Sequence, residues 1–187
     1  MAVGTSQFRN GLKIELDGEP FVIVYFQHVK PGKGGAFVRT KVKNLKTGRV
    51  LDRRFRAGEK VEAADIDDRK MQFLYRDGDQ LVFMDSDSYD QIPFSSDQVG
   101  DAKKYLIENL DVDVLFWRGQ PINIELPAFI RAAVSKCEPG MKGDTASGAT
   151  KPATLETGAV VQVPLFVKEG ERIRVDTRTG EYVERVS

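Results

Sequence analysis

In this sequence of 187 residues, one lysine flanked by glycines is a candidate for binding an anion. It is Lys33, within KPGKGGAF at residues 30–37, and it has no acidic neighbour, no catalytic partner and no apolar cover. Strand-like apolar segments end at Val29 and resume at Ala36, so PGKGG is expected to form a tight turn that holds Lys33 in solvent. A lysine in this position either serves solubility or reaches for an anion, and the tip alone leaves both interpretations open.

The segment after the tip favours recognition of an anion. Because side chains alternate between the two faces of a strand, Arg39, Lys41 and Lys43 are expected on one face. The basic row is expected to continue in Arg53, Arg54 and Arg56. Basic strands beneath a basic tip suit a phosphate backbone, which attracts Lys and Arg without any readout of bases.

The charge distribution points to the same part of the chain. Residues 1–64 hold 13 basic and 6 acidic side chains, a net charge of +7, whereas residues 65–128 hold 6 and 14, a net charge of -8. Residues 129–187 hold 9 and 8, a net charge of +1. The N-terminal third is therefore the candidate for binding a polyanion.

The rare residue types exclude several kinds of chemistry. Cys137 is the only cysteine and His28 the only histidine, which excludes an internal disulfide, a Cys/His zinc site and a histidine relay. Both are expected to be packing or surface residues. We expect no catalytic residue, no metal site and no cofactor.

Two short motifs resemble known sites and fail on their spacing. GKG would need a glycine five residues before its Gly-Lys pair and Ser or Thr after the lysine to be a P-loop, but Gln27 and Gly34 stand there. DSDSYD, residues 85–90, would need an oxygen ligand and then a glycine at the fifth and sixth positions of a calcium loop, where Tyr89 and Asp90 stand. A solvated acidic turn is expected instead.

Short β-branched and aromatic segments separated by Gly, Pro and Asp turns predict an all-β chain. The strands are expected at 12–16, 20–29, 36–45, 71–76, 80–85, 112–117 and 122–126, with one helix at 100–110. No apolar run approaches the about 20 residues of a membrane span. MAVGTSQFRNG lacks the build of a signal peptide, so a cytoplasmic protein with no membrane partner is expected.

The strand count and the charge blocks divide the chain into three compact units. Closing each small sheet into a barrel would remove its exposed edges. The units are expected at 1–64, 65–128 and 129–187. Residues 138–159 are rich in Gly, Ser, Thr and Pro and too long for a simple hairpin, so they predict either a tether or a functional loop.

Several stretches together resemble the bacterial elongation factor P family over the whole length of the chain. They are KPGKGGAF, then LYRDGDQLVFMD with the following YDQIP, and the long run at 142–182. That run carries the family spacing Lys151, Ala153, Gly158, Val163, Pro164 and Gly170. The resemblance implies three β-barrel domains in an L-shaped arrangement, an N-terminal SH3-like (KOW-like) barrel and two OB-type barrels.

The resemblance also implies a function. The family are translation elongation factors that bind the ribosome next to peptidyl-tRNA and promote peptide-bond formation at consecutive prolines, which relieves stalling. By resemblance, Lys33 contacts the acceptor end of the peptidyl-tRNA and is a target for a lysine-modifying enzyme, with Pro31, Gly32, Gly34 and Gly35 supporting its loop. Ribosomal RNA is a further expected partner, and the factor is expected to act as a monomer and not as an enzyme.

A loop motif of the family's third domain matches Gly143, Asp144 and Thr145. By resemblance this loop lies near the exit-site codon on the small subunit, although the same residues would also suit an ordinary turn. The alternative is that the chain is a general single-stranded RNA-binding OB protein. The net charge of -8 in the OB-like middle third disfavours that function, because RNA is itself negatively charged. A hydrolase is disfavoured, because no nucleophile with a base is in view.

Overall fold

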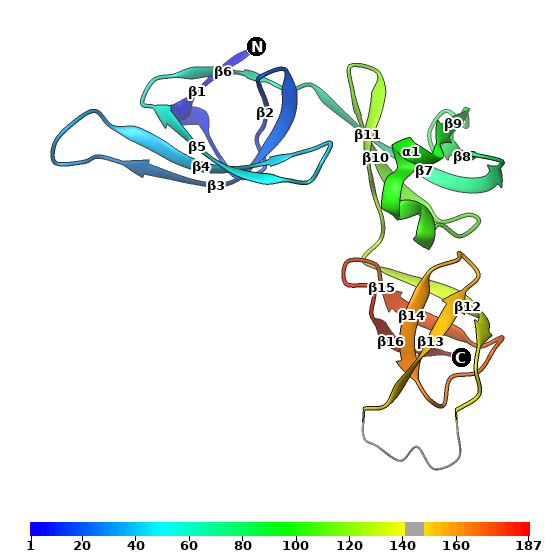
Figure 1. Cartoon of the computed structure of the whole chain (residues 1–187). Coiled ribbons are helices and arrows are strands. Elements are labelled where there is room, and N and C mark those ends of the chain that lie inside the picture. Colours follow the sequence, from blue (N-terminus) through cyan, green and yellow to red (C-terminus); the bar gives the residue numbers. More distant parts are fainter. Residues whose placement is uncertain (141–147) are drawn as a thin grey trace. The chain divides into compact units, whose positions relative to one another are not determined.

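β-Strands are the main secondary structure of the protein, as expected from its sequence. The computed structural model describes residues 1–140 and 148–187, and over these residues it contains sixteen strands in three antiparallel sheets, one short α-helix and two 3₁₀ helices (Figure 1). The sheets curl as half-barrels, which agrees with the predicted fold class. No helix within the described ranges is both long and apolar enough to cross a membrane.

The chain divides into two compact units. Residues 1–68 and 115–123 form one, and residues 69–114 and 124–187 form the other. The predicted division into three domains at 1–64, 65–128 and 129–187 stays a prediction.

The first sheet has the strand order β1-β6-β2-β3-β4-β5. The strands are β1 (Ala2–Gly4), β2 (Lys13–Leu16), β3 (Glu19–Val29), β4 (Phe37–Asn44), β5 (Val50–Arg56) and β6 (Lys60–Ala63), and a 3₁₀ turn η1 (Thr5–Gln7) follows β1. One face of the sheet closes on a core made of Phe8, Ile14, Leu16, Phe21, Ile23, Val38, Val42 and Phe55. In β4 every second residue is buried, so the alternation read from the sequence is confirmed and the basic residues between Val38 and Val42 face outward.

The second sheet has the order β11-β10-β7-β8-β9. Its strands are β7 (Ile66–Asp77), β8 (Gln80–Asp85), β9 (Gln91–Ser95), β10 (Asp111–Trp117) and β11 (Gln120–Glu125). Phe73, Phe83 and Phe94 stack in its interior, with neighbouring ring centroids 5.4 and 5.0 Å apart. Such tilted aromatic pairs add to the free energy gained from burial alone.

The helix predicted at 100–110 is mostly wrong. An α-helix, α1 (Ser96–Val99), ends at Gly100 with a positive φ of 63°, and a 3₁₀ helix, η2 (Gly100–Tyr105), follows and stops at Tyr105. Beyond it, the amide of Asn109 donates to the carbonyl of Phe73 at 2.7 Å, and the amide of Phe73 donates to the carbonyl of Leu110 at 2.9 Å. Pairing with β7 thus takes the backbone groups that a continuing helix would need.

The third sheet has the order β14-β13-β12-β15-β16. Its strands are β12 (Phe129–Cys137), β13 (Thr150–Leu155), β14 (Val160–Pro164), β15 (Arg172–Asp176) and β16 (Tyr182–Val186). Reading all of 138–159 as a tether or loop was wrong for β13, whose alternate residues Lys151, Ala153 and Leu155 are buried. The Nζ atom of Lys151 donates to the carbonyl of Glu138 at 2.6 Å, which satisfies this buried amine.

Candidate nucleic-acid interface

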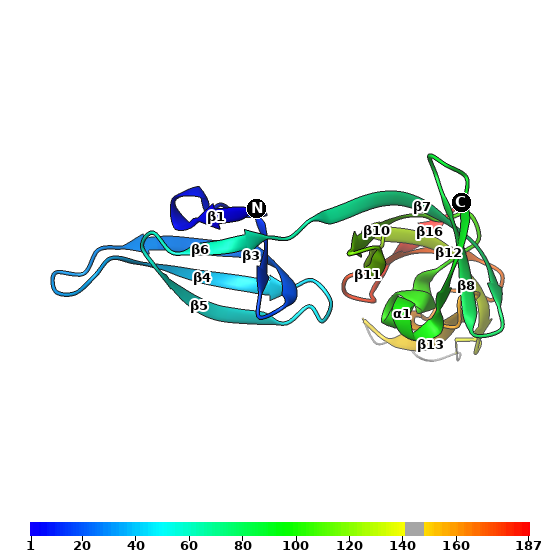
Figure 2. The same ribbon diagram turned by 90° about the horizontal axis from the view of Figure 1, so that it is seen from above.

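The β3–β4 hairpin protrudes beyond the other strands of its sheet, and its tip carries Lys33 (Figures 1 and 2). Beside β3, the pairing with β2 reaches only to Val22, whereas on the other side β5 pairs with β4 up to Arg56 opposite Phe37. Val29 lies opposite Phe37 in the same last row, so the loop at 30–36 is the part that extends beyond the paired strands. Residues 30–35 are all exposed. Lys33 therefore lies in solvent, in a loop carried by two paired strands.

The tip is wider than the tight turn expected from the sequence. Seven residues, 30–36, connect the two strands, and no backbone hydrogen bond joins two residues of this fully described loop. Gly34 has a φ of +98°, which side chains other than glycine rarely adopt, whereas Gly32 and Gly35 have ordinary φ values and open space around them. Of the predicted supporting glycines, Gly34 is therefore the one whose backbone needs the absence of a side chain.

Below the tip, the outer face of β3, β4 and β5 brings cationic side chains together in cross-strand rows. Arg39 lies between Gln27 and Arg54, and Lys41 lies between Tyr25 and Asp52. Lys43 and Arg56 lie on the same outer face, one row beyond at either end. We call this surface, made of Tyr25, Arg39, Lys41, Lys43, Asp52, Arg54 and Arg56, the cationic face.

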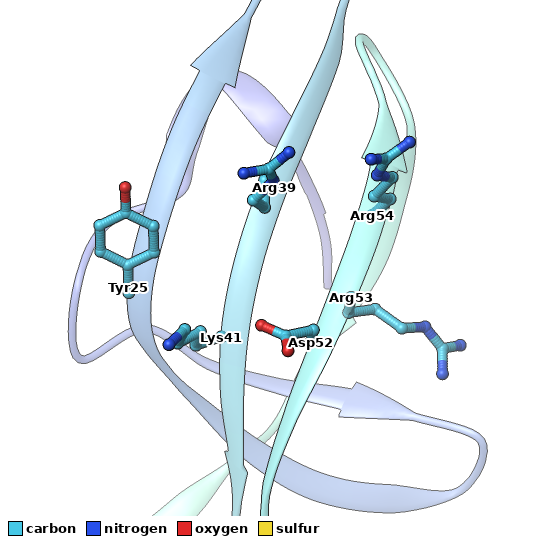
Figure 3. A pocket seen from close by; sticks show the side chains of 6 residues that line it. All are labelled: Tyr25, Arg39, Lys41, Asp52, Arg53 and Arg54. Atoms are coloured by element: carbon cyan, nitrogen blue, oxygen red, sulfur yellow. The ribbon is translucent and has the colours of Figure 1, made fainter.

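Arg53 does not belong to the cationic face. It has the same strand parity as the buried Phe55 and therefore points to the other side of β5, where its Nη1 atom lies 3.3 Å from Oδ2 of Asp17. Figure 3 shows its side chain extending away from Arg39 and Lys41. We expected Arg53 in one row with Arg54 because both are basic, but adjacent residues of a strand point to opposite faces.

The cationic face is hollowed into an open cleft of about 720 Å³ (Figure 3). Tyr25, Arg39, Lys41, Asp52 and Arg54 of the cationic face line it, and Arg53 also borders it although its side chain extends away from Arg39 and Lys41. Within the described part of the chain, Arg39, Lys41 and Arg54 form no ion pair with a carboxylate. The guanidinium of Arg54 lies 4.7 Å from the ring centroid of Phe37 instead. These cations remain available to an external anion such as phosphate.

Sequence reasoning did not identify Tyr25 as a candidate. Its side chain is 43% exposed and borders the cleft beside Lys41. An apolar run such as FVIVYF suggests burial throughout, and only the register shift between Ile23 and Tyr25 turns this ring outward. The pattern of this segment alone gives no sign of that shift, because it arises in the pairing of β3 with β4.

The third candidate set, Gly143, Asp144 and Thr145, lies outside the described residues. Shortly before that segment, Cys137 and Glu138 are hydrogen-bonded to other residues of the third sheet and its loops. The amide of Cys137 donates to Oε1 of Glu169 at 3.2 Å, and Glu138 accepts the buried Lys151 amine.

Two acidic side chains that are not part of the cationic face have altered pKa values. Backbone amides of Asp87 and Ser88 donate to Asp85 and hold its pKa below the ordinary value. Asp85 is only 8% exposed, so this member of the DSDSYD turn is a turn-capping residue and not the solvated carboxylate expected. The Arg178 side chain and backbone donate to Asp176 and lower its pKa likewise. No group of three or more His, Cys, Asp or Glu side chains in the described ranges is placed to hold a metal.

Three family models cover nearly the whole chain. Residues 4–61 match the Elongation factor P (EF-P) KOW-like domain, residues 66–124 match the Elongation factor P (EF-P) OB domain, and residues 130–185 match Elongation factor P, C-terminal. The chain is 55% identical over 184 residues to elongation factor P of Pelotomaculum thermopropionicum, covering 98% of this chain and 100% of the relative. It is 56% identical to elongation factor P of Natranaerobius thermophilus, covering 98% of each.

A similar fold occurs in a solved archaeal structure. Eukaryotic translation initiation factor 5A from Methanococcus jannaschii superposes with a TM-score of 0.52 at 26% identity, covering 67% of this chain and 94% of the other.

Proposed function

Because this chain belongs to the bacterial elongation factor P family, and is therefore a translation elongation factor and not an enzyme, we propose that it acts at consecutive prolines. The ribosome is its partner. In this proposal the factor binds beside peptidyl-tRNA, and its lysine tip reaches toward the acceptor end. Peptide-bond formation at consecutive prolines then resumes. General single-stranded RNA binding is not favoured, because full-length relatives carry the name elongation factor P.

The observation that carries this proposal is the combination of one exposed lysine and one cationic face on the same hairpin. Lys33 lies at the end of paired strands, and Arg39 and Lys41 follow on the outer face of the second strand. A phosphodiester backbone seated on that face would leave the tip free to extend further along the RNA. Phosphate contacts of this kind set position and orientation without reading bases.

The physical role of the tip is positional. The proline ring restricts the backbone and holds the reactants away from productive geometry, which raises the barrier. A cation near the phosphates and ribose of the acceptor end narrows the range of positions that this end visits. The chemistry itself stays with the ribosome, so the factor needs no nucleophile, base or metal.

Five further parts of the function follow from the same proposal. A lysine-modifying enzyme would extend Lys33, which its exposed position permits. Ribosomal RNA would be contacted alongside tRNA, and Gly143, Asp144 and Thr145 would approach the exit-site codon. The three predicted domains would span the distance between these contacts. The factor would work as a monomer in the cytoplasm, where ribosomes are.

The direct test is translation in a reconstituted system with and without the purified factor. One messenger encodes a run of consecutive prolines, and a matched messenger replaces those prolines with alanines. Addition of the factor is expected to raise the yield of full-length product from the proline messenger alone. Equal stimulation of both messengers, or of neither, would contradict the proposal.

A further inference from the structure

A β-bulge in β3 decides which side chain stands among the cations of the first sheet. The register between β3 and β4 shifts between Ile23 and Tyr25, which leaves Val24 as the extra residue. Before the shift Phe21 and Ile23 are buried, and after it Phe26 packs against the same core. Without the extra residue, strict alternation would turn Tyr25 toward the core.

The bulge therefore places an aromatic ring on the cationic face and interrupts the regular pairing of β3 with β4. Tyr25 is 43% exposed and lies directly opposite Lys41, with Arg39 one row further along. Its hydroxyl group donates to Oε1 of Gln27 at a long 3.4 Å, which holds the ring only weakly. Among the described residues, the long bond to Gln27 is the one hydrogen bond of the Tyr25 side chain, and it does not account for an outward tyrosine at this position. Bulges often serve to re-aim a side chain beside a functional site.

Cations and an exposed ring recognise different parts of RNA. Lys and Arg bind phosphate wherever it occurs, in helices and in loops alike. An aromatic ring has a partner only where a base is unpaired, because bases within a helix already stack on one another. The cleft of about 720 Å³ that Tyr25 borders, with Arg39, Lys41 and Arg54 around it, offers both kinds of contact in one place.

We propose that Tyr25 stacks on an unpaired nucleotide of the bound RNA while Arg39, Lys41 and Arg54 hold the phosphates beside it. This inference rests on the proposed function, because it assigns a further contact to the same RNA-binding face. It makes the face selective for a looped or splayed segment over a regular double helix. Tyr25 is thus a specificity-determining residue within a surface otherwise built for charge.

The chain offers a closely matched control. Tyr75 in β7 is 45% exposed, and it too follows a register shift, between Phe73 and Tyr75. It belongs to another sheet and is not part of the cationic face. Tyr75→Ala removes the same atoms from a similar backbone context without touching the proposed site.

The experiment measures binding of the full-length protein to two probes over a range of salt concentrations. One probe is an unmodified tRNA transcript, which contains loops, and the other is a blunt-ended RNA duplex with none. Tyr25→Ala and Tyr25→Leu are expected to weaken tRNA binding about fivefold or more, the loss typical of one stacked base. Tyr25→Phe and Tyr75→Ala should bind as wild type. Duplex binding should be unaffected by all four substitutions.

The salt dependence separates this inference from the function on which it rests. Removing Tyr25 should lower affinity equally at every salt concentration, whereas Lys41→Gln should make the plot of log affinity against log salt less steep. A flatter plot for Lys41→Gln together with wild-type affinity of Tyr25→Ala would overturn the stacking contact alone. An equal loss on tRNA and duplex for Tyr25→Ala, or a loss for Tyr25→Phe as large as for alanine, would also overturn it. An unchanged slope for Lys41→Gln would contradict RNA binding by the cationic face itself.

Discussion

Neutralising the basic residues of β4 should reduce the salt sensitivity of ribosome binding by a calculable amount. The triple variant Arg39→Gln, Lys41→Gln, Lys43→Gln removes three cations that the structure places on one outer face, while Val38 and Val42 keep the core unchanged. Each phosphate contact contributes about 0.7 to 0.9 to the slope of log affinity against log salt, so the slope should fall by about 2 to 3. Between about 50 and 200 mM salt the variant should therefore lose about 20- to 40-fold less affinity than the wild type.

The assay is equilibrium binding of the factor to ribosomes that carry peptidyl-tRNA, with magnesium held constant. A control variant removes the same charge from exposed positions of the third sheet and its loops, through Lys136→Gln, Lys168→Gln and Arg172→Gln. The control should keep most of the wild-type slope, because the excess positive charge lies in residues 1–64. A wild-type slope in the β4 variant, or an equal reduction in the control, would refute the assignment of the cationic face.

Three further predictions concern other parts of the chain. Gly34→Ala should lower rescue of proline stalling because its φ of +98° strains any side chain, whereas Gly32→Ala, with an ordinary φ and open space, should rescue as wild type in the same assay. Asp144→Ala should leave the thermal midpoint within about 2 °C while reducing rescue, and full rescue by this variant would make the residue an ordinary turn residue. Asp176→Asn should lower the thermal midpoint at neutral pH, because the pKa of Asp176 is lower in the folded protein than the unfolded value of 3.8 and its ionised form therefore stabilises the fold above that pH. The difference in thermal midpoint between variant and wild type should disappear as pH falls through the lowered pKa. A difference that persists in acid would argue against the charge pairing with Arg178.

The strands that carry the tip could be predicted from sequence because local signals agree there. The expected segments 20–29 and 36–45 differ from β3 (Glu19–Val29) and β4 (Phe37–Asn44) by one residue at most at either end. Strict alternation in β4 also fixed the outward direction of Arg39 and Lys41. No tertiary contact is needed to read a pattern of this kind.

Other features depend on contacts between distant residues. The bulge before Tyr25 exists only in the pairing of β3 with β4, and the end of the predicted helix at 100–110 follows from hydrogen bonds to Phe73. Lys151 was expected in a tether or loop because residues 138–159 are rich in Gly, Ser, Thr and Pro, yet it is buried and donates to the carbonyl of Glu138. In each case, a long-range hydrogen bond or strand register overrides what the local sequence suggests.

The central claim is that Lys33 acts on peptidyl-tRNA, and rescue of a proline-stalled reporter by Lys33 variants tests it most directly. Because no backbone hydrogen bond joins two residues of the described tip and residues 30–35 are exposed, Lys33→Ala should change the free energy of unfolding by no more than about 0.5 kcal/mol. Rescue should nevertheless decrease from wild type to Lys33→Arg to Lys33→Ala, since arginine keeps the charge but not the geometry or the site for a lysine-specific modification. A proline-free reporter should respond equally to all three proteins. Relief of proline stalling by Lys33→Ala to the wild-type level would contradict the account.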